Sequence, residues 1–201
     1  MKLLFVYVEV LAAALAAVVK VNGTVAVTHE GGFSAFRADI TDLCKEGNNE
    51  MTIEVSNEDT PSMYPASADF TFYGGLYRGV NLISVPHTHF DLDYYGGSGI
   101  KVTPKPTEDG GATFEIESFV TNQEDCFTVM YSIEDACGCE VAAAVRPADD
   151  TAVTIYVPDA KLWSMDEPNL YTVVARLQKN NETYDEIHVN TGVRSYSVTP
   201  D

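Results

Sequence analysis

Apolar and polar residues alternate along most of the chain, and β-branched residues occupy many of the apolar positions. Successive side chains of a strand point to opposite faces, so this period of two predicts half-buried strands. The alternation is clear at 51–55, and Asn22-Gly23 between two β-rich runs predicts a tight hairpin. Further strands are expected at 19–21, 24–28 and 80–85.

The second half of the chain repeats this pattern at more regular spacing. No stretch of ten residues there has helical periodicity, and turn-forming clusters separate strands expected at 112–120, 127–133, 140–145, 152–157, 171–177 and 183–189. Short strands at this spacing predict a sandwich of about 100 residues, much like an immunoglobulin domain. We therefore predict an all-β protein of two domains, 1–86 and 87–199, divided next to Pro86.

The first twenty residues resemble a secretory signal, with an apolar run followed by alanines. Glu9 places a charge inside that run, and Lys2 alone supplies the positive charge that a signal needs. The run is also too short to span a membrane. We favour strand, loop and strand here over a helix or a signal. This predicts a protein of the bacterial cytoplasm, with secretion as the alternative.

The charge balance is strongly acidic, with 12 Lys and Arg against 30 Asp and Glu and a net charge of −18. Such a chain repels phosphate backbones and anionic membrane surfaces, so neither nucleic acid nor a membrane is expected as a partner. Hydrophobic residues make up 45% of the chain, which is enough for packed cores.

Few residues form a pattern that indicates catalysis or metal binding. Cys137-Gly138-Cys139 is too tight for a zinc knuckle and is expected to be a hairpin turn, so the four cysteines are interpreted as free thiols. His87 and His89 are spaced to share a strand face, but no third ligand is identifiable, which favours a polar face or a linker contact. No nucleophile elbow or phosphate-binding loop is present. No residue is predicted to be catalytic or to bind a metal.

The segment 69–80 is the one candidate for ligand binding. It combines aromatic residues, the pair Gly74-Gly75, the acid Asp69 and the cation Arg78. Aromatic faces stack on sugar rings, and carboxylates accept hydroxyl hydrogen bonds. A purely structural interpretation stays open, in which the glycines form a bulge and Arg78 is a buried salt-bridge partner.

Five motifs in order resemble the N-terminal region of glycoside hydrolase family 2, which includes β-galactosidases, β-glucuronidases and β-mannosidases. The likeness covers nearly the whole chain. It rests on Lys20–Gly23 with 30–41, on the turn and strand 46–55, on 69–78 (D-F-x-x-x-x-G-L-x-R), on 162–171 (L-W-S and P-N-L-Y) and on 191–194 (T-G-V-R).

The resemblance implies a jelly-roll, galactose-binding-like sugar-binding domain followed by an immunoglobulin-like domain. In the family a barrel with two catalytic glutamates comes next, and this chain is expected to lack it. The first domain looks truncated at its N-terminus, so exposed edges and core surface are expected. By resemblance, Asp69 is a substrate-binding residue that holds a sugar hydroxyl. Trp163 and Arg194 are expected in core and interdomain contacts.

We therefore expect the accessory part of a retaining exo-glycosidase that acts on terminal β-galactosides, with a β-glucuronidase as the alternative. No cofactor is expected in this chain, while the resemblance allows a monovalent or divalent cation in the parent enzyme and a homo-oligomer. A second class of function is a stand-alone carbohydrate-binding module with an exposed aromatic platform. A third is a structural module, which buried aromatic residues at 70–77 would support.

Overall fold

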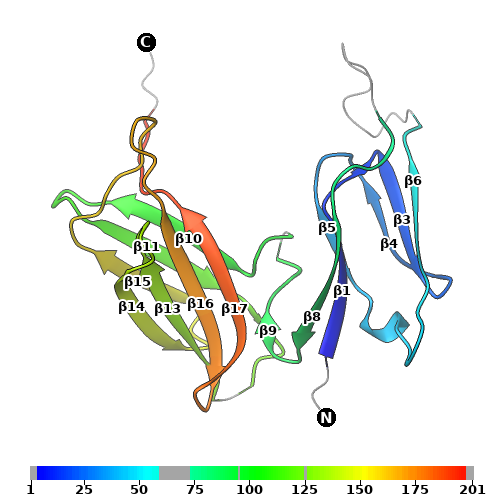
Figure 1. Cartoon of the computed structure of the whole chain (residues 1–201). Coiled ribbons are helices and arrows are strands. Elements are labelled where there is room, and N and C mark those ends of the chain that lie inside the picture. Colours follow the sequence, from blue (N-terminus) through cyan, green and yellow to red (C-terminus); the bar gives the residue numbers. More distant parts are fainter. Residues whose placement is uncertain (1–3, 59–72, 95, 125, 198–201) are drawn as a thin grey trace. The chain divides into compact units, whose positions relative to one another are not determined.

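A computed structural model describes residues 4–58, 73–94, 96–124 and 126–197. The chain divides into two compact units, Met1–His87 and Thr88–Asp201, each with its own hydrophobic core (Figure 1). Strands dominate both units, and a single 3₁₀ turn, η1 (Thr41–Leu43), is the one helical element among the described residues. The expected all-β class is confirmed. No helix in the described part of the chain has the length and apolarity needed to cross a membrane.

The described part of unit 1 contains two three-stranded antiparallel sheets and one short strand pair. The strand orders are β5-β1-β8, β4-β3-β6 and β2-β7. The apolar residues of the two larger sheets share one core cluster, so the sheets pack face to face as a sandwich. The strands are β1 (Leu4–Val10), β2 (Ala13–Ala14), β3 (Ala16–Val21), β4 (Thr24–Glu30), β5 (Phe36–Asp39), β6 (Met51–Ser56), β7 (Gly75–Leu76) and β8 (Val80–Pro86).

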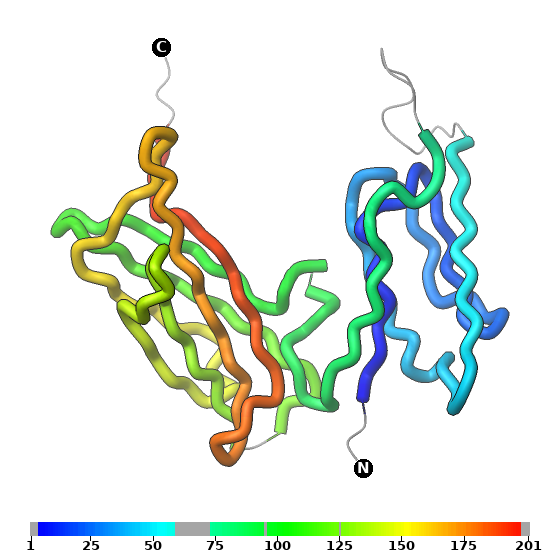
Figure 2. Tube along the Cα trace, in the orientation of Figure 1, coloured from blue at the N-terminus to red at the C-terminus, as the bar shows by residue number. Residues whose placement is uncertain are grey.

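The predicted hairpin at Asn22-Gly23 is confirmed. It joins β3 to β4, which lie side by side in the chain trace (Figure 2). Both turn residues have positive φ, 49° for Asn22 and 82° for Gly23, as a two-residue hairpin of this kind requires. The Asn22 amide also donates to the Leu43 carbonyl oxygen at 2.8 Å, which ties the hairpin to η1.

Glu9, the charge that argued against a signal peptide, lies in β1 on the face opposite the core. In register it pairs with Arg37 of β5 and Asn81 of β8. The Arg37 guanidinium lies 2.7 Å from one Glu9 carboxylate oxygen, and the Asn81 amide donates to the other at 2.8 Å. Burial of Glu9 raises its pKa, but the bonds from Asn81 and Arg37 outweigh this, and the net pKa is lowered.

The edge strand β8 leaves apolar side chains uncovered on the core side of its sheet. Val8 and Leu82 are direct cross-strand partners and so share a face, yet Val8 is 1% exposed and Leu82 is 67% exposed. Val80, two residues before Leu82, is also exposed. Uncovered core-side residues are what an incomplete first sandwich would show. The truncation itself stays a prediction.

Unit 2 is a sandwich of a three-stranded and a four-stranded antiparallel sheet. The orders are β10-β11-β15 and β14-β13-β16-β17, and β9 pairs with β12 separately. In β11 and β15 every second residue is buried, as the alternation predicts. The strands are β9 (His89–Phe90), β10 (Ile100–Pro106), β11 (Ala112–Ser118), β12 (Val120–Thr121), β13 (Thr128–Glu134), β14 (Glu140–Pro147), β15 (Ala152–Val157), β16 (Tyr171–Lys179) and β17 (Glu182–Thr191).

Two details of unit 2 differ from the sequence prediction. The strand β10 was not expected, because Pro104 and Pro106 interrupt its pattern. Its position at the edge of the sheet explains the prolines, since an edge strand tolerates residues that cannot donate a ladder hydrogen bond. The strand expected at 112–120 is instead split into β11 and β12.

Asp185 of β17 ties the first segment of unit 2 to the four-stranded sheet. Its carboxylate accepts hydrogen bonds at 2.9 Å from the backbone N–H of Phe90 in β9 and from that of Glu186. Burial raises the pKa of Asp185 above its ordinary value, against the opposing effect of these hydrogen bonds and of nearby His89. The Asp185 carboxylate therefore holds β9 against the sheet, and its burial costs desolvation free energy.

We expect Glu9→Gln to lower the free energy of unfolding by about 1–3 kcal/mol at neutral pH, because Arg37 loses its charged partner. A lowered folded-state pKa gives stability that is present above the ordinary glutamate value of 4.5 and lost as the pH falls through the folded-state pKa. Urea unfolding of both proteins between pH 3 and pH 7 measures this, and the difference should shrink toward the acid end.

The control is Glu54→Gln, which removes an exposed cross-strand ion pair with Lys20 in the same unit. Such a pair contributes less than about 1 kcal/mol. Equal effects of the two substitutions, or a difference that is independent of pH, would contradict the role of Glu9.

Candidate functional site

Four exposed apolar side chains of unit 1 come from two segments, and we call them together the aromatic rim: Phe33, Tyr73, Leu76 and Tyr77. Phe33 belongs to the loop between β4 and β5, and the other three lie on and around β7. β7 is placed by pairing with β2, where Ala14 lies opposite Gly75. Gly75 has a φ of 101°, which favours glycine and allows the chain to enter β7.

Hydrogen bonds join the two segments of the rim. The Tyr77 hydroxyl donates to the carbonyl oxygen of Gly32, and the Arg78 guanidinium donates to that of Phe33 at 3.2 Å. The Arg78 guanidinium also lies over the Tyr77 ring, 5.3 Å from its centroid. At Gly74, an added Cβ would lie 2.8 Å from Cγ of Asn57, so the chain leaving β6 and the chain entering β7 approach closely.

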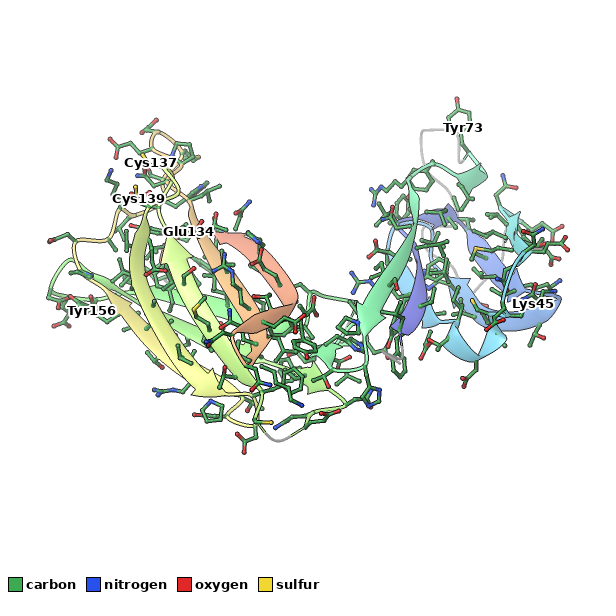
Figure 3. The ribbon with its side chains drawn as sticks, turned by 60° about the horizontal axis from the view of Figure 1, so that its bottom comes forward. Lys45, Tyr73, Glu134, Cys137, Cys139 and Tyr156 are labelled. Carbon is green, nitrogen blue, oxygen red and sulfur yellow. The ribbon has the colours of Figure 1, made fainter. Side chains whose placement is uncertain are left out.

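The aromatic rim is open to solvent. Tyr73 is 80% exposed and stands at one end of the unit in Figure 3, while Phe33 is 56% and Tyr77 is 47% exposed. A structural module was expected to bury the aromatic residues of 70–77. Tyr73 and Tyr77 do not fit that alternative. They agree instead with an exposed platform.

The structure bears differently on each residue that the sequence suggested for the site. Asp69 falls in 59–72, outside the residues that the structure describes, so its role stays a prediction. Arg78 is exposed, and the alternative of a buried salt-bridge partner is wrong for it. Phe33 was quoted only as part of a motif, and its exposure could not be read from the sequence, because an aromatic residue after two glycines is equally compatible with a core position.

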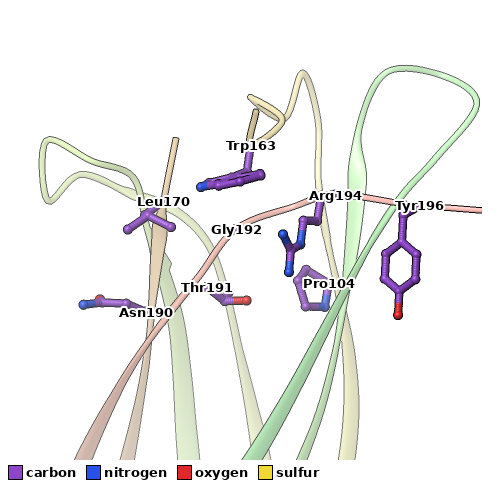
Figure 4. Close-up of a pocket in the computed structure, with 8 residues that line it drawn as sticks. All are labelled: Pro104, Trp163, Leu170, Asn190, Thr191, Gly192, Arg194 and Tyr196. Atoms are coloured by element: carbon purple, nitrogen blue, oxygen red, sulfur yellow. The ribbon is translucent and has the colours of Figure 1, made fainter. Parts of the chain in front are cut away.

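Unit 2 has a hollow of about 540 Å³ around Trp163, which we call the Trp163 hollow (Figure 4). The Arg194 guanidinium lies over the Trp163 ring, 5.0 Å from its centroid. The lining residues come from β10, the loop before β16, the end of β17 and the segment that follows β17. They are Pro104, Trp163, Leu170, Asn190, Thr191, Gly192, Arg194 and Tyr196.

Backbone pairing holds Trp163 in place. Its N–H donates to the carbonyl oxygen of Val193 at 2.8 Å, and it forms an isolated bridge with Pro168. Val193 is fully buried, but Trp163 is half-buried and Arg194 is exposed. The expectation that Trp163 is a core residue is therefore wrong, since the core position of this segment is the neighbouring Val193.

Exposed apolar side chains extend from the Trp163 hollow. Tyr196 is 88% and Met165 is 89% exposed, and Leu162 and Leu170 are about half exposed. Of these, Leu170 and Tyr196 line the hollow, and the loop before β16 carries Leu162 and Met165.

The histidines and cysteines that were considered as metal ligands do not form a site in the described residues. His89 is fully buried in β9, and the His87 ring lies 5.7 Å from that of Phe5. Within the described residues, no three His, Cys, Asp or Glu side chains are grouped as metal ligands. The four cysteines form no disulfide, and the expected turn at Cys137-Gly138-Cys139 joins β13 to β14.

Two family models match consecutive parts of the chain. The model of the sugar binding domain of glycosyl hydrolases family 2 matches residues 8–86, and that of glycosyl hydrolases family 2 matches residues 98–194. The chain belongs to glycoside hydrolase family 2. The resemblance drawn from five sequence motifs is thereby confirmed, together with the two sandwich domains that it implied.

Relatives in this family carry two kinds of name. The chain is 30% identical, over 88% of its length, to a putative β-glucuronidase of Formosa agariphila. It is 27% identical, over 89% of its length, to a β-galactosidase of Bacteroides ovatus. It spans 21% of each of these relatives.

A solved structure is much more similar. This is an FMN-binding β-glucuronidase from Faecalibacterium prausnitzii, 83% identical, with a TM-score of 0.96. The match covers 98% of this chain and 31% of that one.

We expect Gly192→Ala to displace Trp163, because the added Cβ would lie 2.9 Å from the Trp163 Cβ. The strain should cost about 1–3 kcal/mol of stability. Trp163 is the only tryptophan, so its fluorescence emission reports the displacement directly.

Gly110→Ala serves as the control. Gly110 has a positive φ of 86° and open space around it, so the added methyl strains only the backbone and should leave the emission maximum in place. An unshifted emission maximum in Gly192→Ala would show that Trp163 is not held against Gly192.

Proposed function

We propose that the chain is the sugar-binding and immunoglobulin-like part of a retaining β-glucuronidase. The 83% identity to a β-glucuronidase, over nearly the whole chain, carries this proposal. The sequence-based expectation favoured terminal β-galactosides as substrates, and relatives named β-galactosidase support that as the second candidate. Retaining glycosidases use two carboxylates about 5 Å apart. In this proposal those groups belong to a catalytic domain outside the 201 residues.

The two surfaces have separate roles in this proposal. In unit 1, Asp69, four residues before Tyr73 in the sequence, holds a sugar hydroxyl by a charge-assisted hydrogen bond. The Trp163 hollow and the exposed side chains beside it pack against the catalytic domain. Aromatic residues, Met and Arg are the types enriched at the centre of protein interfaces, and Trp163, Tyr196, Met165 and Arg194 fit that composition.

The activity test compares nitrophenyl β-glucuronide with nitrophenyl β-galactoside, using the full-length enzyme that contains this chain. A site built to pair with a sugar carboxylate rejects the analogue that lacks it, so we expect kcat/KM to favour the glucuronide by at least about a hundredfold. The opposite preference would support the β-galactosidase. The 201-residue chain alone should show no turnover of either compound, and turnover above background would contradict the assignment of the catalytic carboxylates to another domain.

We expect Asp69→Asn in the full-length enzyme to lower kcat/KM about tenfold or more, because the sugar loses a charge-assisted hydrogen bond. Asp42→Asn, an exposed acid in η1 of the same unit, is the matched control and should have little effect. An Asp69→Asn enzyme with the kinetics of the Asp42→Asn enzyme would remove Asp69 from the site.

A further inference from the structure

The turn between β13 and β14 carries two of the four cysteines, Cys137 and Cys139, with one residue between them (Figure 3). Both are exposed and neither belongs to a disulfide, so a reagent in solution reaches both thiols. All four cysteines of the chain belong to the described residues. This turn is the one place where two exposed cysteines are close in the sequence.

The third cysteine of unit 2, Cys126, lies at the other end of β13. It precedes that strand, whereas Cys137 and Cys139 follow it. A strand of seven residues is about 20 Å long, and a disulfide needs Cα atoms less than about 7 Å apart. The fourth, Cys44, is half-buried and belongs to unit 1. Within unit 2 a disulfide can therefore join only Cys137 and Cys139.

Hydrogen bonds hold this turn in one shape. The Asp135 carboxylate accepts a bond from the N–H of Cys137 at 2.8 Å and another from that of Cys139 at 3.0 Å. The Gly138 N–H donates to the Asp135 carbonyl oxygen, and the Asp135 N–H donates to the Cys139 carbonyl oxygen, each at 2.9 Å. Gly138 has a φ of 76°, a conformation that favours glycine. The backbone that carries both thiols is thus ordered before any reaction.

The spacing of the two cysteines also suits a disulfide. Cα atoms of residues two apart are separated by at most about 7 Å, and disulfide-bonded Cα atoms lie about 4.4–6.8 Å apart. A bond across one intervening residue closes a small, strained ring, and strained or exposed disulfides are the easily reduced ones. The chemistry expected of this pair is therefore reversible oxidation rather than a permanent crosslink.

We propose that Cys137 and Cys139 form a redox-active dithiol that small-molecule disulfides, such as oxidised glutathione, convert to an intrachain disulfide. One thiolate attacks the small disulfide, forms a mixed disulfide and releases one small thiol. The second thiolate then attacks the protein sulfur of that mixed disulfide, forms the bond between the two cysteines and releases the other small thiol. The small disulfide is the oxidant that accepts two electrons, and the two protons end on the released thiols. This inference does not rest on the proposed glycosidase activity.

The test incubates the full-length enzyme that contains this chain, first fully reduced, with an excess of oxidised glutathione. The remaining thiols are then blocked, and mass spectrometry shows what each cysteine-containing peptide carries. We expect the peptide with Cys137 and Cys139 to lose the mass of two hydrogens and to carry neither glutathione nor the blocking group. Cys126, a single exposed thiol, can form only the mixed disulfide. An excess of reduced glutathione should restore both thiols of the turn.

Variants with one thiol on the turn are the matched comparison. In Cys137→Ser and in Cys139→Ser the reaction should stop at the mixed disulfide, so the remaining cysteine carries glutathione. Cys126→Ser should form the disulfide of the turn as the wild type does. The proposal would be overturned by a wild-type enzyme in which both cysteines of the turn carry glutathione. It would also be overturned if both stayed reduced under conditions that modify the single cysteine of Cys137→Ser.

A second probe tests whether the reduced thiols of the turn act as a pair. Phenylarsine oxide binds two neighbouring thiols through its arsenic atom and releases one molecule of water. We expect the wild-type turn to retain this compound against an excess of a monothiol, and Cys137→Ser to release it. Equal retention by the two proteins, or loss from both, would show that Cys137 and Cys139 do not act together.

Discussion

The register of β1 between β5 and β8 decides which side of unit 1 becomes its core. In that register Val8 and Val10 point toward β3, and Glu9 points away, between Arg37 and Asn81. A slip by one residue would turn Glu9 into the core and the valines out. The strand β1 has apolar residues on both faces, so hydrophobicity alone does not fix its register. The ion pair favours one register over the others, in addition to its effect on stability.

The aromatic rim depends on this arrangement through the short strand β7. Two residues of β7 pair with two of β2, and β2 directly precedes β3 of the second sheet. The hydrogen bonds from Tyr77 and Arg78 join the two rim segments to each other, while the pairing of β7 with β2 and the bond from Gly31 N–H to the Leu15 carbonyl oxygen attach them to the sandwich. Their contacts are local and partly exposed, whereas the contacts of β1 and β3 are buried. Loops carried on such a scaffold can vary in sequence while the register underneath is kept.

Period-two alternation was sufficient to predict most strands and the all-β class, since each strand buries one face. It failed at β10, where edge position rather than pattern permits Pro104 and Pro106. The order of the five motifs was sufficient to predict the family. Side-chain exposure was not predictable, because it depends on what packs above a residue. Trp163 was expected in the core, but it is half-buried at the surface, with the Arg194 guanidinium over its ring. The motifs are shared by family members with several activities, so they do not identify the sugar that is bound. The sequence-based expectation favoured β-galactosides, whereas an 83% identical protein is a β-glucuronidase.

The two exposed apolar surfaces have one feature in common, an arginine over an aromatic ring. Arg78 lies over Tyr77 in unit 1, and Arg194 over Trp163 in unit 2. Such a guanidinium covers part of the ring in the absence of a partner and keeps its charge in water. In a chain of net charge −18 it also offsets the negative potential that would repel an acidic ligand or an acidic domain. The arginines thus place positive charge next to the exposed rings of an otherwise strongly acidic chain.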